Sequence, residues 1–387
     1  MDQGRKPHVL LLYRLMIPSI RLCGHCQMEE LARLGYIDYR ACRELNVTNS
    51  DLNWADVVLL GRLDSWYEYQ LVKKLKKAGK YLVYVIDDDL LNVPLELSSA
   101  EYYAQPEIKH NIRRMIELSD AILSPSPLLL RKYVNGKRAG LLVEEPAIDP
   151  IPYERHDPAM PIKIGFAGSV DRTGDLEDIL SNVLGRIKRE YGDRVQFEFF
   201  GAIPAFAEDL DAVVIPYCDS YDAYRKTLND RKWDIGLAPM PDTPFHACKH
   251  YNKFIEYAAA GCLTIHSELE PYLRLKAFQS SMFSLNDKAC WYAQLRKVID
   301  DDAYREELRR RACEVAHNRL NCSVIAQELF ESAKQCIPCI ERVGCVSVCL
   351  PVMKGIGYIV HMRIRLRLIR KRGPHYIWKK VCQKVFG

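Results

Sequence analysis

Residues 246–267 read HACKHYNKFIEYAAAGCLTIHS, and this stretch decides the fold expected for the chain. Lys249, Lys253 and Glu256 lie at positions i, i+4 and i+7, so on an α-helix they share one face. Two lysines one turn apart repel each other, and a cation near the N-terminus of a helix opposes the helix dipole. Both penalties reverse when an anion binds there, and the carboxylate can accept hydrogen bonds from sugar hydroxyls. The segment therefore suits a nucleotide diphosphate-sugar as its ligand.

The same stretch ends in a strand, and strands and helices alternate along the rest of the chain. Gly261 follows the alanine-rich turn at which the helix is expected to stop. Such alternation is typical of doubly wound α/β domains. The predicted strands are Val9 to Tyr13, Ala55 to Gly61, Tyr81 to Ile86, Ala121 to Ser124, Lys163 to Ala167, Gln196 to Gly201, Val213 to Pro216, Asp234 to Pro239 and Leu263 to His266. The predicted helices are Gln27 to Leu34, Tyr67 to Lys77, Glu107 to Leu118, Pro127 to Tyr133, Ala303 to His317 and Ser323 to Lys334.

A proline-rich stretch, Pro146 to Pro161, is predicted to link two such domains. We expect a Rossmann-like acceptor-side domain over residues 1–150, a Rossmann-like donor-binding domain over 151–335 and a basic tail over 336–387. A chain of 387 residues with 48% hydrophobic residues can supply two cores. Two α/β halves around a linker predict an interdomain cleft at the carboxyl ends of their strands, where such folds bind ligands.

A glycine-containing turn is a second candidate for ligand binding. Residues 168–175 read GSVDRTGD and lead from a predicted strand into a helix expected to begin near Leu176. Gly168 and Ser169 let backbone N–H groups approach a phosphate at the N-terminus of that helix. Arg172 can add a bidentate contact to phosphate oxygens. An ordinary turn explains this pattern equally well when the pattern is taken alone.

The run from Lys249 to Gly261, KHYNKFIEYAAAG, resembles the donor-binding segment of nucleotide-sugar glycosyltransferases with the two-domain GT-B fold, and most closely their retaining branch. Two more segments resemble the same family. Residues 164–169, IGFAGS, resemble its phosphate loop, and residues 233–239, WDIGLAP, resemble the strand that leads to the donor helix. The likeness covers residues 8–330 in outline, and its specific part covers 160–275.

The resemblance implies roles for the residues of the donor helix. Lys249 and Lys253 would bind the pyrophosphate, and Glu256 would accept a hydrogen bond from a ribose hydroxyl. The resemblance also implies transfer with retention of anomeric configuration. No metal or other cofactor is expected if Lys249, Lys253, Arg172 and a helix N-terminus balance the leaving pyrophosphate. The chain departs from the family at Cys248, where a first glutamate is common, and at Cys262-Leu263, which replaces a small residue and proline. No catalytic acid or base is assigned.

In the N-terminal half, a predicted strand ends in three aspartates, Asp87, Asp88 and Asp89. In one interpretation they contact acceptor or donor hydroxyls, as in GT-B relatives. In another, Asp87 and Asp89 form the metal-binding D-x-D motif of the single-domain GT-A class, which holds a divalent ion against the donor diphosphate. In a third, they form a polar loop that caps the next helix. We prefer the first, and take Asp87, Asp88, Arg14 and Arg21 as acceptor-side candidates without a metal.

The C-terminal tail concentrates the positive charge of the chain. From Val352 to Gly387 there are five lysines, five arginines and no acidic residue, whereas the whole chain carries a net charge of +5. The segment that begins at Pro374 would place five apolar residues on one helical face: Ile377, Trp378, Val381, Val385 and Phe386. A basic amphipathic element of this kind predicts contact with an anionic membrane surface. Nucleic-acid binding and packing onto the N-terminal domain are the alternatives, and we favour neither.

Composition sets further expectations. The sequence contains no secretory signal and no run of about 18 apolar residues, so we expect no export and no transmembrane helix. Its 14 cysteines are scattered, which favours a reducing compartment. Free thiols explain both of its cysteine clusters better than a redox motif or a zinc site does. These clusters are Cys23-Gly-His-Cys26 and the group Cys336, Cys339, Cys345 and Cys349.

Together these features predict a cytoplasmic glycosyltransferase at the inner face of the cell membrane. It would move a sugar from a nucleotide diphosphate-sugar to a glycan acceptor that is lipid-linked and destined for the cell surface. Its partners would be the donor, the acceptor and the anionic membrane, but not nucleic acid. Two alternatives stay open. One is a metal-dependent transferase that uses Asp87 and Asp89, and the other is a catalytically silent binding protein of the GT-B fold.

Overall fold

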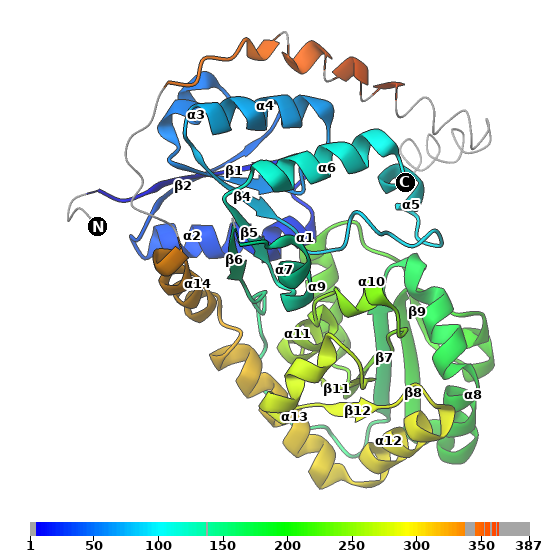
Figure 1. Ribbon diagram of the computed structural model, residues 1–387. Helices are drawn as coiled ribbons and strands as arrows, with labels where there is room; N and C mark the ends of the chain where they lie inside the picture. The colour runs from blue at the N-terminus through cyan, green and yellow to red at the C-terminus, as the bar shows by residue number, and fades with distance from the viewer. Residues whose placement is uncertain are drawn as a thin grey trace. The chain divides into compact units, whose positions relative to one another are not determined.

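The chain folds into two six-stranded β-sheets, each with helices packed against it (Figure 1). The computed structural model describes residues 5–136, 138–336, 345–351, 353–356, 358–360 and 362–363. The described residues divide into two units. Unit 1 takes them from 1–124, 130–141 and 332–387, and unit 2 takes them from 125–129 and 142–331.

Unit 1 has the strand order β2-β1-β3-β4-β5-β6. Its strands are β1 (His8–Tyr13), β2 (Asp38–Arg43), β3 (Val57–Gly61), β4 (Tyr81–Val85), β5 (Ala121–Ser124) and β6 (Ala139–Leu142). Its helices are α1 (Pro18–Ile20), η1 (Arg21–His25), α2 (Cys26–Arg33), α3 (Asn49–Trp54), α4 (Trp66–Lys77), α5 (Ala100–Tyr103), α6 (Pro106–Leu118) and most of α7 (Pro127–Tyr133). Neighbouring strands from β2 to β5 run parallel. Helices α4 and α6 cover one face of this sheet, and α2 covers the other (Figure 1).

Unit 2 has the strand order β12-β11-β10-β7-β8-β9, and all its neighbouring strands run parallel. Its strands are β7 (Ile162–Gly168), β8 (Val195–Gly201), β9 (Val213–Ile215), β10 (Ile235–Ala238), β11 (Leu263–Ser267) and β12 (Met282–Ser284). Its helices are η2 (Val170–Arg172), α8 (Thr173–Tyr191), η3 (Gly192–Arg194), η4 (Ala205–Leu210), α9 (Tyr221–Arg231), α10 (Pro244–Ala247), α11 (Asn252–Ala259), η5 (Tyr272–Phe278), α12 (Lys288–Asp300), α13 (Asp302–Asn318) and most of α14 (Cys322–Cys336). Apolar residues of α8 and α12 form the core on one face of the sheet. Residues of α9, α11 and α13 form a second core on the other face.

The predicted alternation of strands and helices is confirmed, and so is the pair of Rossmann-like α/β domains. The elements Ala121–Ser124 and Pro127–Tyr133 have the predicted bounds, and most others differ only at their ends. The sequence analysis missed β2, because this edge strand reads DYRACR and has no fully buried position. It also missed the short helix α3, although Thr48 and Asp51 form a capping box at its start.

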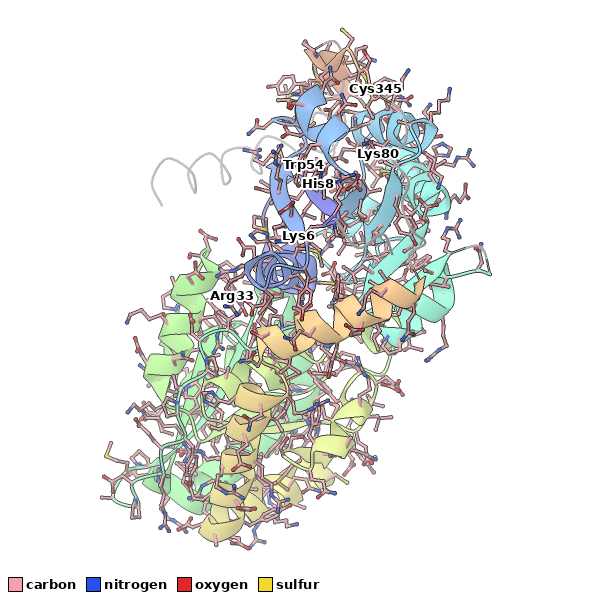
Figure 2. The ribbon with its side chains drawn as sticks, turned by 90° about the vertical axis from the view of Figure 1, so that its left-hand side faces the viewer. Lys6, His8, Arg33, Trp54, Lys80 and Cys345 are labelled. Carbon is pink, nitrogen blue, oxygen red and sulfur yellow. The ribbon has the colours of Figure 1, made fainter. Side chains whose placement is uncertain are left out.

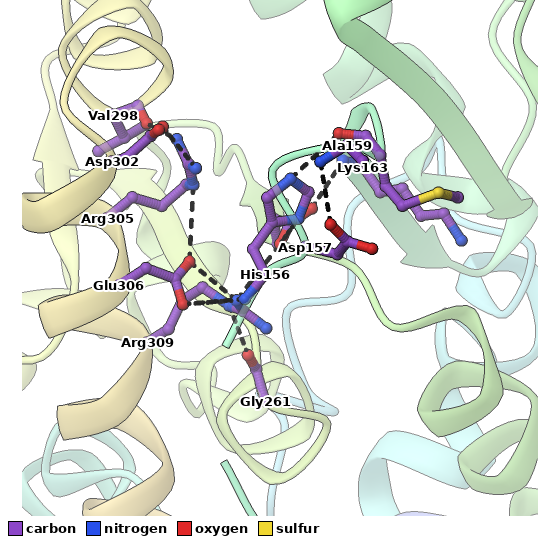
Figure 3. Close-up of polar contacts among 12 residues, drawn as sticks. His156, Asp157, Ala159, Lys163, Gly261, Val298, Asp302, Arg305, Glu306 and Arg309 are labelled. Carbon is purple, nitrogen blue, oxygen red and sulfur yellow. Dashed lines mark hydrogen bonds and ion pairs between the residues drawn. The ribbon is translucent and has the colours of Figure 1, made fainter. Parts of the chain in front are cut away.

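The linker predicted over residues 146–161 belongs to unit 2 and packs against it. The backbone N–H of Ile151 donates to the carbonyl oxygen of Ala259 at 2.8 Å. The N–H of His156 donates to Glu306 on α13 at 3.2 Å, and Glu306 in turn pairs with Arg309 at 2.9 Å (Figure 3). The chain therefore passes into unit 2 near Leu142, earlier than the predicted boundary at 150.

The C-terminal region also differs from the predicted separate tail over 336–387. Its described residues from Ser332 onward belong to unit 1. Residues 364–387, which contain the predicted amphipathic segment that begins at Pro374, lie outside the described residues. Among the helices that the structure does describe, none combines the length and the apolar composition needed to cross a bilayer.

Two glycines in the central strands of unit 2 make room for aromatic side chains. A Cβ atom at Gly165 on β7 would lie 2.1 Å from Cδ2 of Trp233, and a Cβ at Gly236 on β10 would lie 2.3 Å from Cδ2 of Tyr257. The indole is fully buried, and its Nε1 donates to Glu198 at 2.7 Å. The glycines of the WDIGLAP and IGFAGS segments thus have a packing role, because only glycine fits against these two rings.

The stability of unit 2 is expected to depend on pH through a buried histidine on β11. His266 stacks on Tyr272 at 4.7 Å between ring centroids, and its Nε2 lies 2.9 Å from the hydroxyl oxygen of Ser281. Burial lowers its pKa to about 3, so the imidazole stays neutral in the folded protein. Between about pH 3 and 6.5 the unfolded chain therefore binds one proton more than the folded chain does. Neutral His266 therefore contributes fully to the free energy of unfolding above pH 6.5, and this contribution is lost as the pH falls.

We expect His266→Phe, which keeps an aromatic ring in this place, to remove that dependence. Below pH 6.5 the wild-type protein should lose about 1.4 kcal/mol more per pH unit than the variant does. Urea unfolding of both proteins between about pH 5 and 7 measures the difference, and this window lies above the range in which ordinary carboxylates titrate. Equal slopes for the two proteins would show that His266 is not held neutral.

Candidate functional site

The sheet of unit 2 opens between β7 and β10, where the direction of the strand order reverses. From β7 the chain continues to β8 and β9 on one side, and from β10 it continues to β11 and β12 on the other. The two strands pair only at Ile164 and Gly165 of β7. Beyond that point the hydroxyl of Tyr257 stands between them, accepting from Ala167 N at 2.9 Å and donating to Leu237 O at 3.2 Å. Open α/β sheets bind ligands outside the carboxyl ends of the strands at such a switch point.

The predicted phosphate loop lies at this edge, directly after β7. Gly168 is the last residue of the strand and pairs in register with Gly201, the last residue of β8. Gly201 has a φ of +81°, and a Cβ there would lie 2.3 Å from the carbonyl oxygen of Gly168. Ser169 is exposed, and α8 begins at Thr173, before the predicted start near Leu176. The loop backbone and the first turn of a 19-residue helix are thus available to an anion.

Arg172 bridges the two sides of the switch point. Its Nη2 donates to the carbonyl oxygen of Pro239, which follows β10, at 2.7 Å, and its Nε lies 2.7 Å from Asp175. The guanidinium is therefore held by the protein itself, with 17% of its side chain exposed. Arg172 therefore joins the loop after β7 to the loop after β10. Its direct contact with phosphate stays a prediction.

Lys249 does not lie on the helix that carries Lys253 and Glu256, so this part of the sequence prediction is wrong. Helix α10 ends before it, and α11 begins only at Asn252. The backbone is not helical at Tyr251 (φ −85°, ψ 42°), whose hydroxyl donates to Glu144, 107 residues earlier in the sequence. Lys249 instead places its Nζ 4.7 Å from the ring of Phe245.

Lys249 nevertheless lies at the same edge of the sheet. Burial raises the pKa of Asp175 in the first turn of α8, and the charges of Arg172 and Lys249 oppose that shift. The Lys249 ammonium is therefore within electrostatic range of the phosphate loop. Its contact with the pyrophosphate stays a prediction.

Lys253 and Glu256 share one face of α11, as predicted. Lys253 Nζ lies 2.9 Å from Glu256 Oε2, and only 11% of the Glu256 side chain is exposed. Tyr224, on α9, donates its hydroxyl hydrogen to the same oxygen at 2.8 Å. Burial and the nearby carboxylate both raise the pKa of Tyr224, so it stays a neutral donor. The sequence analysis missed Tyr224, which lies 32 residues before Glu256 and belongs to no motif.

Charged groups of the phosphate loop and of the donor helix both act on one buried side chain, Tyr272. Burial raises the pKa of Tyr272, while the charge of Arg172 lowers it and the charges of Glu256 and Asp175 raise it further. The Tyr272 hydroxyl thus lies within range of both groups of residues. Gly168, Ser169 and Arg172 thus follow β7 directly, and the charges of Lys249 and Glu256 act on groups that Arg172 also affects.

A second polar cluster fixes the start of α11. Glu144 accepts hydrogen bonds from His250 at 2.8 Å and from Tyr251, and it pairs with Arg274. Burial alone would raise the pKa of Glu144, but the hydrogen bond from His250 and the charge of Arg274 lower it. The cluster holds the segment before α11 away from helical geometry, which explains the position of Lys249. No sequence pattern indicates this cluster, because Glu144, His250 and Arg274 are far apart along the chain.

The acceptor-side candidates lie in unit 1. Arg14 follows β1, and its Nη2 lies 2.5 Å from Asp64 and 3.0 Å from Glu68. Arg21 lies in η1 near His25, whose pKa is lowered by burial and further by this charge. Of these two acceptor-side candidates, Arg14 is thus paired with carboxylates, whereas Arg21 lies near a histidine.

Of the three aspartates after β4, two act on Arg62 and the third has other partners. Asp87 pairs with Arg62, at 3.2 Å between its Oδ2 and Nη1, and the charge of Asp88 also acts on Arg62. Arg62 follows β3 and has a φ of +50°, which is unusual for a residue other than glycine. Asp89 pairs with Lys132 at 2.5 Å and accepts a hydrogen bond from Tyr133. The sequence analysis missed Arg62.

No protein-family model and no curated protein matches the sequence. Solved structures do match the fold. Sucrose-phosphate synthase from Thermosynechococcus elongatus is 12% identical, with a TM-score of 0.59 over 85% of this chain and 99% of its own. Anabaena HepE in complex with UDP and glucose is 12% identical, with a TM-score of 0.55 over 84% and 99%. A Listeria monocytogenes protein assigned as a UDP-N-acetylglucosamine 2-epimerase is 12% identical, with a TM-score of 0.53 over 89% and 100%.

At these identities the likeness concerns the fold. The chain has two Rossmann-like α/β domains, and the likeness to these structures extends over both of them. It has the GT-B fold, which confirms the fold predicted from the residues around the donor helix.

Proposed function

We propose that the chain is a glycosyltransferase that takes a sugar from a nucleotide diphosphate-sugar bound at the carboxyl edge of the unit 2 sheet. One observation supports the proposal. The charge of Lys249 acts on Asp175 beside the phosphate loop, and the charges of Arg172 and of Glu256, the partner of Lys253, both act on buried Tyr272. The proposal is supported by solved structures of the same fold, among them HepE in complex with UDP and glucose.

The cations of this edge suit the leaving pyrophosphate. Lys253, Lys249 and the N-terminus of α8 would balance the negative charge that develops when the bond to the sugar breaks. Glu256 would accept a hydrogen bond from a ribose hydroxyl, while Tyr224 holds its carboxylate in place. In the structure described here, Lys253 contacts Glu256, so donor binding would exchange that ion pair for contacts to the ligand. Transfer would proceed without a metal and with retention of configuration.

The charges of unit 1 favour an acceptor that offers neutral hydroxyl groups. Arg14 is already paired with Asp64 and Glu68, and Arg62 is paired with Asp87. A phosphorylated acceptor would have to displace these carboxylates from both arginines, at the cost of leaving buried charges unpaired. A glycan hydroxyl can instead donate to a carboxylate such as Asp87 or Asp88. We propose a lipid-linked glycan as this acceptor, with the protein working at the inner face of the membrane.

The metal-dependent alternative would use Asp87 and Asp89. The two carboxylates point to different cations, Arg62 and Lys132, and both ion pairs would have to break before they could share a divalent ion. The residues therefore fit the metal-independent mechanism better. The catalytically silent alternative keeps the fold and loses turnover, so only an activity measurement separates it from the enzyme.

A nucleotide-sugar panel tests the function directly. We expect one donor to release nucleoside diphosphate in the presence of membrane lipid extract, with transfer of labelled sugar to the lipid fraction. A neutral glycoside should be a better acceptor than the matching sugar phosphate, and EDTA should leave the rate unchanged. Loss of activity with EDTA would restore the metal-dependent alternative.

Two outcomes would contradict the proposal. Conversion of the nucleotide-sugar into its epimer without transfer would show that the fold serves a different reaction here. A thermal shift with nucleoside diphosphates but no turnover of any donor would identify a binding protein.

A further inference from the structure

An extended segment near the C-terminus is fastened to α3 of unit 1 by two asparagines. Asn53 donates to the carbonyl oxygen of Val346 at 3.1 Å and accepts from the N–H of the same residue at 2.6 Å. Asn49, one helical turn earlier, makes the same pair of bonds with Val348, at 3.1 and 3.2 Å. The side chains of Val346, Val348 and Leu350 are buried, whereas the residues between them are exposed. This alternation and the two paired amides give the segment one fixed register on the helix.

The fastened segment leads into a helical stretch, which is described at residues 350–351, 353–356, 358–360 and 362–363. Lys354 donates to the carbonyl oxygen of Val47, so this side of the stretch faces unit 1. Figure 2 labels Cys345, at the start of the fastened segment, close to Lys80 and Trp54 of unit 1. The stretch therefore runs along unit 1 from a defined starting point.

The opposite side of the helical stretch is apolar and exposed. A helix turns by about 100° per residue, so Ile356 and Ile359 lie on the side away from Lys354. Ile356 is 42% exposed, Ile359 55% and Met362 39%. Met362 lies on the flank, whereas Tyr358, which is 63% exposed, lies on the side of Lys354. Isolated exposed apolar residues are common, but Ile356, Ile359 and Met362 lie within seven positions and form a surface that favours contact with an apolar phase.

Charge identifies the kind of apolar phase. Nine lysines and arginines follow this surface in the sequence, from Arg363 to Lys384, and there is no acidic residue from Val352 to the end of the sequence. A second protein surface is rarely so uniformly acidic, whereas an anionic lipid bilayer offers negative headgroups above an apolar layer over its whole area. A surface that carries both apolar side chains and cations can contact the apolar layer and the headgroups together.

We propose that Ile356, Ile359 and Met362 form a docking surface for an anionic phospholipid membrane, presented by unit 1 through the Asn49 and Asn53 anchor. The surface brings unit 1, the domain that we assign to the acceptor, to the membrane. This assignment of the partner rests on no residue of the donor site. The docking surface and the transferase activity can therefore fail independently of each other.

Vesicle binding by the full-length chain tests the proposal. The protein should sediment with vesicles that contain phosphatidylglycerol, should bind pure phosphatidylcholine vesicles at least about tenfold more weakly, and should be released by high salt. The variant Ile356→Ser/Ile359→Ser/Met362→Ser should lower binding to the anionic vesicles about tenfold or more. The matched control Leu95→Ser/Leu285→Ser changes side chains that are 84% and 57% exposed elsewhere, and it should bind as the wild type does.

Several results would overturn the proposal. Unchanged vesicle binding by the triple variant would place the membrane contact elsewhere. A change from dimer to monomer with unchanged vesicle binding would identify the surface as a contact between copies of the chain. Tight binding to nucleic acid without binding to vesicles would assign the basic residues to another partner. Turnover of a water-soluble acceptor should be equal in the triple variant and the wild type, so lost docking can be told apart from lost activity.

Discussion

Replacement of Lys253 by methionine is expected to lower the rate of sugar transfer about 100-fold or more. The side chain is only 23% exposed, and its ammonium lies at the switch point of the sheet, 2.9 Å from Glu256. A preorganised cation that meets developing negative charge at a water-excluded site contributes about 100- to 1,000-fold to kcat. Methionine keeps most of the apolar stem and removes the charge. Release of nucleoside diphosphate at saturating donor measures the loss.

A matched control separates this effect from a general loss of stability. Lys226→Met removes a lysine of the same unit whose side chain is 78% exposed and pairs with Asp230 at 2.7 Å. This variant should keep wild-type activity, because exposed ion pairs contribute little to stability. If Lys253→Met lowers the melting temperature but leaves kcat and KM unchanged, Lys253 only supports Glu256, and the assignment of the donor site is wrong.

Gly165→Ala is expected to destabilise the protein by about 3 kcal/mol or more. The new Cβ would lie 2.1 to 2.4 Å from three atoms of the Trp233 indole, far inside van der Waals contact. The ring cannot move aside easily, because its Nε1 is bonded to Glu198, which also makes two bonds to Arg231 at 2.6 Å each. Overpacking in cores of this density commonly costs 1–3 kcal/mol, and here both the backbone and a fixed ring resist relaxation. Urea unfolding or soluble yield measures the effect.

The control for this prediction is another glycine-to-alanine change in the same unit. At Gly185, in the middle of α8, the nearest atom to a new Cβ is the flexible end of Arg189 at 3.6 Å. Alanine there should stabilise the protein by about 0.5–1 kcal/mol, because it favours the helix and restricts the unfolded chain. If Gly165→Ala unfolds like the wild type, Trp233 does not pack on β7 in solution as it does here.

Several residues show how far the candidate site could be predicted. Lys253 and Glu256 were placed correctly because their spacing within one helix is a local property of the sequence. Lys249 was misplaced because the start of α11 is decided by the contacts of His250 and Tyr251 with Glu144, more than 100 residues away. No periodicity within a short window contains a contact of that range.

The partners of the predicted residues could not be foreseen for the same reason. Tyr224 reaches Glu256 from a different helix, and Arg62 reaches Asp87 from a different strand. Parallel strands bring their carboxyl ends to one edge, so the region of these residues follows from the alternation of strands and helices. The pairing within that region depends on side-chain packing.

The alternation of strands and helices, the two α/β domains and the helix face shared by Lys253 and Glu256 could all be predicted from local sequence patterns. These features follow from hydrophobic periodicity, helix capping and turn residues, which act over a few neighbouring positions. The tertiary structure alone decided where the chain passes from one unit to the other, how Arg172 is held, and that residues 345–350 fasten to α3. Those outcomes depend on contacts between residues far apart in the sequence, whose energies are set only when the buried surfaces meet.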